Sequence, residues 1–246
     1  MGNALSLWWQ SFVAKFILCF VKDSRWKYIV RGLGTTLEVT VLALVLGVVL
    51  GVVIAAIRAS HDQQKGSLHG PARVIMGILN AICKIYVTVI RGTPVMIQLM
   101  IMYFVILVNS RNMVFVAVMA FGINSGAYVA EIVRGGIMSV DIGQTEASRS
   151  LGLGYLDTMR FVVIPQAVKN ILPALGNELI SLLKETSIVT VIGLADLTRG
   201  ANIILGATYE AFMPLLAAAL IYLGMVLILS WLLGKLERRM RQSDRR

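Results

Sequence analysis

The stretch GQTEASRSLGLGYLDTMRFVVIP, from Gly143 to Pro165, decides how this sequence is interpreted. Long apolar segments lie on both sides of it. Polar side chains are costly inside a lipid bilayer, so we expect the stretch to project into water between two membrane spans. Its polar and charged positions, which alternate with small residues, are Gln144, Glu146, Arg149, Asp157 and Arg160.

The composition indicates an integral membrane protein. Hydrophobic residues make up 57% of the 246 positions and charged residues only 15%, whereas about a quarter of a soluble domain is charged. The formal net charge of +10 is concentrated in short loops and in the C-terminal tail, as is typical of cytoplasmic loops of membrane proteins. Nucleic-acid binding is therefore not expected.

The cysteines and histidines favour no metal site and no catalytic centre. Cys19 and Cys83 lie far apart in apolar surroundings, and His61 and His69 share a polar loop without an acidic cluster. No metal, no catalytic residue and no cofactor are expected in this chain.

The apolar pattern predicts an all-α membrane protein with about five transmembrane helices, since a span needs about 20 apolar residues. Residues 74–85 are expected to approach the membrane along its surface, and the second span to bend near Pro94. Residues 58–73 are expected to form a polar loop. The predicted spans cover residues 33–57, 86–108, 114–137, 170–194 and 214–234.

The distribution of lysine and arginine predicts the orientation. The loops around residues 58–73 and 139–165 and the tail carry most of the positive charge and should be cytoplasmic. Five spans then leave the basic N-terminal segment outside, which breaks this rule, and a sixth span at residues 5–21 is the alternative. Trp8, Trp9 and Phe12 favour a helix lying in the membrane interface. The expected regions are an interfacial segment (1–31), a membrane domain (32–236) and a basic tail (237–246).

The polar stretch itself is expected to contain a short helix. Asp141 can cap the start of this helix, Gly152 and Gly154 can end it, and Pro165 restricts how the next helix begins. Such a helix could press into a groove of a partner, but an ordinary solvated loop would satisfy the same physical argument.

The residues of the loop resemble a known motif. Glu146-Ala147-Ser148, then Gly152, then Val162-x-Ile164-Pro165 have the spacing of the "EAA" loop in permease subunits of bacterial ABC importers, with conservative changes at Ser148, Val162 and Ile164. The chain from about residue 32 to its end also resembles the permeases for polar amino acids. The matching blocks are GLGTTLEVT (32–40), RGTPVMIQL (91–99), NSGAYVAEIVRGGI (124–137) and GNELISLLKETSIVTVIGLADLTR (176–199).

The resemblance implies the permease subunit of an ATP-driven amino acid importer, with the type I importer fold, in the bacterial cytoplasmic membrane. It implies a second permease copy, identical or paralogous, a cytoplasmic ABC ATPase dimer and an extracytoplasmic solute-binding protein. ATP and Mg²⁺ would bind the ATPase, because this chain has no GxxxxGK[ST] phosphate loop. The residues implied to couple to the ATPase are Gln144, Glu146, Ala147, Ser148, Leu151, Gly152 and Pro165.

Polar residues within the predicted spans are candidates for the substrate pathway. Glu178 and Ser181 share one helix face, and Gln98 and Asn124 lie near mid-span. Gln98 and Asn124 are equally suited to bridging helices. Glu131 and Arg134, three residues apart, are expected to form a structural ion pair beside the loop.

Two other classes of function were weighed. An intramembrane enzyme would need a serine and a histidine facing each other within the membrane, or an HExxH motif, and the sequence offers neither. A secondary transporter acting alone would be expected to show an inverted repeat, and the sequence shows no internal repeat.

Overall fold

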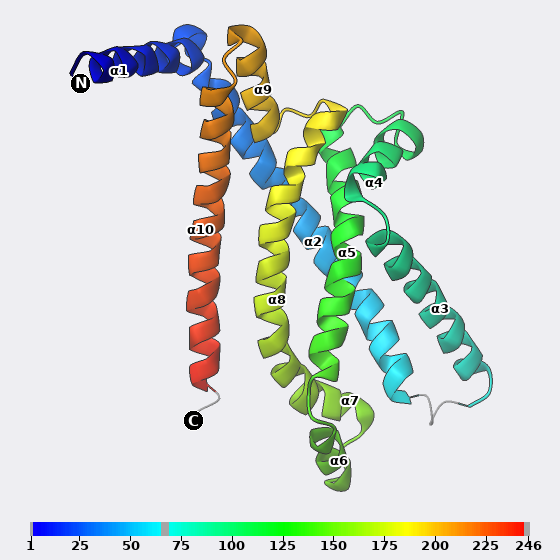
Figure 1. Cartoon of the computed structure of the whole chain (residues 1–246). Coiled ribbons are helices and arrows are strands. Elements are labelled where there is room, and N and C mark those ends of the chain that lie inside the picture. Colours follow the sequence, from blue (N-terminus) through cyan, green and yellow to red (C-terminus); the bar gives the residue numbers. More distant parts are fainter. Residues whose placement is uncertain (1, 65–68, 244–246) are drawn as a thin grey trace.

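The computed structural model describes residues 2–64 and 69–243, and within these residues it contains helices and no strands. The long helices lie roughly side by side and define the long axis of the molecule (Figure 1). Among the described residues, four helices are long and apolar enough to cross a membrane: α2 (Trp26–Gln64), α3 (Pro71–Arg91), α5 (Met113–Met138) and α10 (Phe212–Ser243).

A fifth crossing is built from several pieces. Helix α8 (Ile164–Glu185) continues as the 3-10 turn η5 (Thr186–Ile192), and α9 (Leu197–Thr208) follows at an angle of 48°. Gly193 ends η5 with a φ of 84°, a left-handed conformation that glycine adopts without steric cost. The Asp196 side chain then accepts hydrogen bonds from the backbone amides of Thr198 and Arg199 and so caps α9.

The second span differs from the prediction. Residues 74–85 are not an interfacial approach, because α3 is one continuous helix from Pro71 to Arg91. At 21 residues it is about 31 Å long, enough to span a bilayer core. The expected break near Pro94 is present: the chain leaves the helix at Gly92 and resumes as α4 (Val95–Ile101) and the π-helical η3 (Met102–Ile106).

Helix α2 is longer than the predicted first span. Its 39 residues make it about 58 Å long, so that it extends beyond a bilayer core of about 30 Å. The segment from Arg58 to Gln64, predicted to be part of a loop, is the helical end of α2. The proposed boundary between residues 31 and 32 also falls inside α2, and the boundary at residue 237 falls inside α10.

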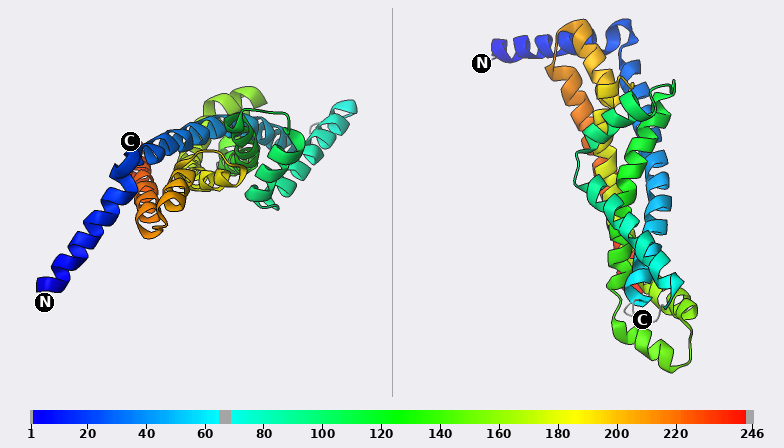
Figure 2. Two further views of the ribbon diagram at one scale, coloured as in Figure 1. Left: turned by 90° about the horizontal axis from the view of Figure 1, so that it is seen from above. Right: turned by 90° about the vertical axis from the view of Figure 1, so that its right-hand side faces the viewer.

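The N-terminal helix α1 (Gly2–Phe16) extends sideways away from the bundle at one end of the molecule, and α10 ends at the other (Figures 1 and 2). The π-helical η1 (Ile17–Val21) and the turn η2 (Lys22–Ser24) connect it to α2. Lys15 forms an ion pair of 3.0 Å with Glu210, which holds α1 against the turn between α9 and α10. This arrangement agrees with five crossings and with an N-terminal helix outside the bundle.

Helices α2 and α5 make the closest long contact of the fold. A Cβ atom at Gly47 would lie 2.9 Å from Ser125 Cβ, and one at Gly51 would lie 2.5 Å from Val129 Cγ1. From the other side, a Cβ atom at Gly122 would lie 2.5 Å from the Leu46 side chain. Glycines four residues apart let two helices approach until their backbones nearly touch, which is a common way of packing helices in membranes.

The N-terminal part of α2 packs in the same way against α9. A Cβ atom at Gly32 would lie 2.3 Å from the carbonyl oxygen of Asp196. The backbone amide of Leu197 donates to Thr36 Oγ1 at 3.2 Å, and both residues are buried. Two of the sequence blocks, residues 32–40 and 176–199, therefore meet at this contact.

Candidate functional site

The polar stretch forms a short helical knob at the end of the molecule that also carries the C-terminus (Figure 1). It comprises α6 (Ile142–Ser150), α7 (Tyr155–Thr158) and the π-helical η4 (Met159–Val163). The Asp141 side chain caps α6 by accepting from the amide of Gly143, which confirms the predicted start.

The end of α6 is a Schellman motif. Gly152 has a φ of 85°, its amide donates to Arg149 O, and the amide of Leu153 donates to Ser148 O. A left-handed residue at this position favours glycine, so Gly152 ends the helix as predicted. Pro165 is the second residue of α8, but α8 continues directly from the π-helical η4, so Pro165 lies within a helical run that starts at Tyr155 and does not begin a separate helix.

The knob is tied to the spans on both sides. Asn170 Nδ2 in α8 donates to Ser139 Oγ at 2.9 Å, directly after α5 ends. Gln166 Nε2 donates to Gln144 Oε1 at 3.4 Å and so links α8 to α6. These contacts connect the start of α6 to both α5 and α8.

The coupling candidates divide into an exposed and a buried set. Ser148 is buried and its hydroxyl donates to Gln144 O. The apolar side chains of Ile142, Leu151 and Leu156 are 75%, 83% and 78% exposed, so their apolar surface is left uncovered at the tip of the knob. The exposed candidates are Gln144, Glu146, Ala147, Leu151, Gly152 and Pro165.

Two of the pathway candidates contact each other. Asn124 Nδ2 in α5 donates to Gln98 Oε1 in α4 at 2.9 Å. Gln98 Nε2 donates in turn to Ile90 O and to Thr93 Oγ1, at the break between α3 and α4. These amides therefore bridge helices, the alternative that the sequence left open, and they also fix the conformation of the chain before Pro94.

The other pathway candidates lie on the neighbouring side of α5. Ser125 Oγ donates to Glu178 Oε1 in α8 at 2.8 Å, and Ser181 follows Glu178 by one turn and is half-buried. Since Asn124 and Ser125 are adjacent, α5 brings all four candidates into one region. Ser125 is a further polar residue of this region that the span pattern did not single out, although its position beside Asn124 in a matching block is a usable signal.

A cation also belongs to this region. The guanidinium carbon of Arg91 lies 5.0 Å from the ring centroid of Tyr128, which follows Asn124 on α5 by one turn. Arg91 opens one of the resembling blocks but was not proposed as a pathway residue. An arginine and a carboxylate near each other can bind the two charged groups of a zwitterion.

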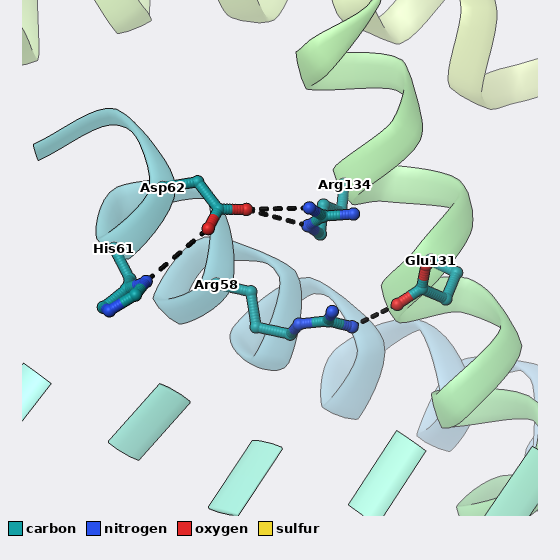
Figure 3. Close-up of polar contacts among 5 residues, drawn as sticks. All are labelled: Arg58, His61, Asp62, Glu131 and Arg134. Carbon is teal, nitrogen blue, oxygen red and sulfur yellow. Dashed lines mark hydrogen bonds and ion pairs between the residues drawn. The ribbon is translucent and has the colours of Figure 1, made fainter. Parts of the chain in front are cut away.

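The predicted ion pair between Glu131 and Arg134 is wrong, because each residue pairs with a different partner. Each residue reaches across to α2 instead: Glu131 pairs with Arg58, and Arg134 pairs with Asp62 (Figure 3). Side chains three residues apart on one helix compete with residues on a packed neighbour, and here the parallel contact with α2 supplies better-placed opposite charges. The expected structural role remains.

Comparison with known proteins identifies the family. Residues 66–242 match the family described as "Binding-protein-dependent transport system inner membrane component". The chain belongs to this family. It is therefore a membrane-spanning permease subunit, which confirms the predicted function and that the chain is not itself an enzyme. The family gives no support to an intramembrane enzyme or to a transporter acting alone.

Curated relatives cover most of the chain. The arginine transport system permease protein of Bacillus subtilis (strain 168) is 44% identical over 186 residues, which are 70% of this chain and 85% of the relative. The glutamine transport system permease protein of Escherichia coli (strain K12) is 41% identical over 181 residues, 72% of this chain and 83% of the relative.

Solved structures confirm the importer permease fold. An amino acid ABC transporter crystallised with histidines has a TM-score of 0.78 and 43% identity, and the match covers 89% of this chain and 98% of that one. The MetNI methionine ABC transporter, in an inward-facing conformation, has a TM-score of 0.75 at 19% identity and covers the same shares, which shows the fold alone.

Proposed function

We propose that this permease imports polar amino acids across the bacterial cytoplasmic membrane, driven by a separate ATPase that holds ATP and Mg²⁺. The observation that carries this is the knob: the start of α6 is linked to α8 through Ser139 and Gln144, while apolar side chains of the knob are exposed to water. An uncovered apolar tip on a rigid support is suited to a groove in a partner. The relatives, named for arginine and glutamine transport, support an amino acid as the substrate.

The partners follow from the same comparison. One structural neighbour is an amino acid ABC transporter and another is a methionine ABC transporter, which supports an ATPase dimer as the partner of α6 and a second permease copy beside this one. The family is binding-protein-dependent, which supports a solute-binding protein on the opposite side. The knob would then face the cytoplasm, as the lysine and arginine distribution predicts.

The polar region between α3, α4, α5 and α8 is the proposed substrate path. Glu178 is suited to bind an ammonium group and Arg91 to bind a carboxylate. Every free amino acid carries both an ammonium group and a carboxylate. Ser125 holds the carboxylate of Glu178 in place, and the Asn124–Gln98 pair supports the chain break that positions Arg91. An additional cationic side chain on the substrate would interact with Glu178 more strongly than a neutral one.

Reconstitution tests this function. The permease, its co-encoded ATPase and its binding protein are placed in proteoliposomes, and uptake of labelled arginine, histidine, glutamine and leucine is measured. We expect uptake of the polar amino acids only with ATP and loaded binding protein present. Accumulation by the permease alone, driven by an ion gradient, would contradict the proposal and favour a secondary transporter.

A further inference from the structure

Four charged side chains join α2 to α5 at the end of the bundle from which the knob projects (Figure 3). Arg58 contacts Glu131, and Arg134 donates through Nε and Nη2 to one carboxylate oxygen of Asp62, at 3.1 and 2.8 Å. The four side chains are between 13% and 30% exposed. Partial burial makes these pairs harder to separate than solvated surface pairs, because a charge left without its partner is poorly hydrated.

The order of the charges specifies how α5 is placed along α2. The two helices run in the same direction (Figure 1), and the positive residue comes first on α2 whereas the negative residue comes first on α5. Each charge therefore meets its opposite in the observed register. A slide of one helical turn would bring Arg58 towards Arg134, so the like charges oppose sliding.

The glycine contact fixes the distance between the same two helices. Because Cβ atoms at Gly47 and Gly51 would already clash with α5, the backbones leave no gap through which one helix could shift against the other. Close packing at mid-span and paired charges at one end restrain separation and register together.

Helix α2 extends from this charged end to the opposite end of the bundle. Arg134 lies about one turn before the end of α5, which leads directly into α6. At the far end, Thr36 and Gly32 of α2 hold the start of α9. If α2 moves together with α6, the movement is therefore transmitted to the start of α9.

We propose that the pairs Arg58–Glu131 and Asp62–Arg134 act as a clamp that makes α2 and α5 one rigid body. The clamp would pass the displacement of α6 through α2 to the outer end of the bundle. These four are positioning residues, and the inference rests on the proposed docking of α6 on an ATPase. Rigid-body movement of packed elements is an established way for a local displacement to act at a distance.

Charge reversal tests the clamp in proteoliposomes that contain the complete importer. We expect Arg58→Glu or Glu131→Arg alone to lower amino acid uptake per ATP hydrolysed by about tenfold, because like charges then face each other. The double variant Arg58→Glu/Glu131→Arg should regain most of the loss. Reversal of Lys15 alone, in the pair with Glu210 at the other end of the bundle, is the matched control and should leave uptake per ATP unchanged.

A cross-link provides a second measurement that does not depend on charge. Cysteines at positions 58 and 131, in a chain with Cys19 and Cys83 replaced by alanine, are joined by a short bismaleimide. Because both substitutions remove one pair of the clamp, this variant should transport less per ATP than the parent before cross-linking, and the cross-link should restore transport. Loss of transport on cross-linking would overturn the inference, because it would show that α2 and α5 must separate during each cycle.

The two proposals fail in different ways. If the purified permease does not retain the ATPase, the docking of α6 is wrong. If the ATPase is retained but single charge reversals leave uptake per ATP unchanged, the clamp alone is wrong.

Discussion

At the scale of single residues, small and polar side chains carry most of the specific information. Gly47 and Gly51 let α2 reach α5, and Gly32 lets it reach the start of α9. Ser125 is small enough to sit beside Gly47 while its hydroxyl holds Glu178. One residue thus serves both the packing of the bundle and the proposed substrate path.

The first prediction at this scale concerns Glu178. Glu178→Gln keeps the size of the side chain and its ability to accept from Ser125 but removes the charge. A hydrogen bond to a charged group contributes about 1.5–3 kcal/mol, so uptake of a cationic amino acid should fall about ten- to a hundredfold. A neutral amino acid should be affected much less. Initial rates of labelled arginine and glutamine uptake measure the difference.

Glu185 provides the matched control, since it lies two turns further along the same helix and is half-buried. Glu185→Gln removes the same charge and should reduce arginine uptake less than Glu178→Gln does. Equal arginine uptake by Glu178→Gln and the parent would make Glu178 a structural residue.

At the scale of an element, α6 shows how a nine-residue helix is kept in place outside the bundle. Helices this short are not stable alone, because nucleation of the first turn costs more free energy than a few hydrogen bonds return. Here the Asp141 cap, the Schellman motif at Gly152 and the contacts with α8 supply the missing stability. The exposed face then remains free for a partner.

The second prediction concerns the tip of this element. Leu151→Ser should leave the folded permease intact, because the Leu151 side chain is 83% exposed and supports nothing within the chain. Full burial of a leucine on docking contributes about 1.5–3 kcal/mol, so affinity for the ATPase should fall about tenfold or more. Co-purification and a titration of ATPase against permease in nanodiscs measure this.

Tyr209→Ser is the control for the tip. Tyr209 is 94% exposed and lies in the turn between α9 and α10, at the opposite end of the molecule. Removing this ring should not alter ATPase binding. Unchanged binding by Leu151→Ser would argue that the tip of α6 does not enter the partner.

At the scale of the whole molecule, four of the described helices are long enough to cross a membrane, and the bent segment from α8 to α9 makes a fifth candidate. Five crossings would place α1 and the end of α10 on opposite sides of the membrane. The knob, the end of α2 and the C-terminus share one end, and α1 and α9 share the other (Figure 2). Trp8 and Trp9 are about 60% exposed, consistent with α1 lying where tryptophan is favoured, at the membrane interface.

The third prediction tests this topology. In a chain with Cys19 and Cys83 replaced by alanine, a cysteine at Ser150 on the knob should be protected from an impermeant maleimide in intact cells. A cysteine at Asn109, between η3 and α5, should react. Burial raises the pKa of the Cys19 thiol and so lowers its thiolate fraction, but its replacement removes any background. Labelling of the Ser150 variant from outside would reverse the orientation.

The sequence by itself determined the class of the protein and the position of the knob. Apolar length and local helix signals act over short distances along the chain, and they predicted the Asp141 cap, the Gly152 end and the spans other than the second correctly in outline. Local signals also placed the break before Pro94. These signals did not predict where α3 starts. Residues 74–108 form a largely apolar region of 35 positions, and the helix within it ends only where the chain turns at Gly92.

Only the tertiary structure decided which residues meet. Glu131 and Arg134 pair with α2 and not with each other, Asn124 binds Gln98, and Ser125 holds Glu178. These partners lie between 26 and 73 residues apart in the chain. Their meeting depends on the register of packed helices, which is set by close contacts such as those of Gly47 and Gly51. The free energy of such contacts is a sum over whole helix faces, so no short stretch of sequence predicts it.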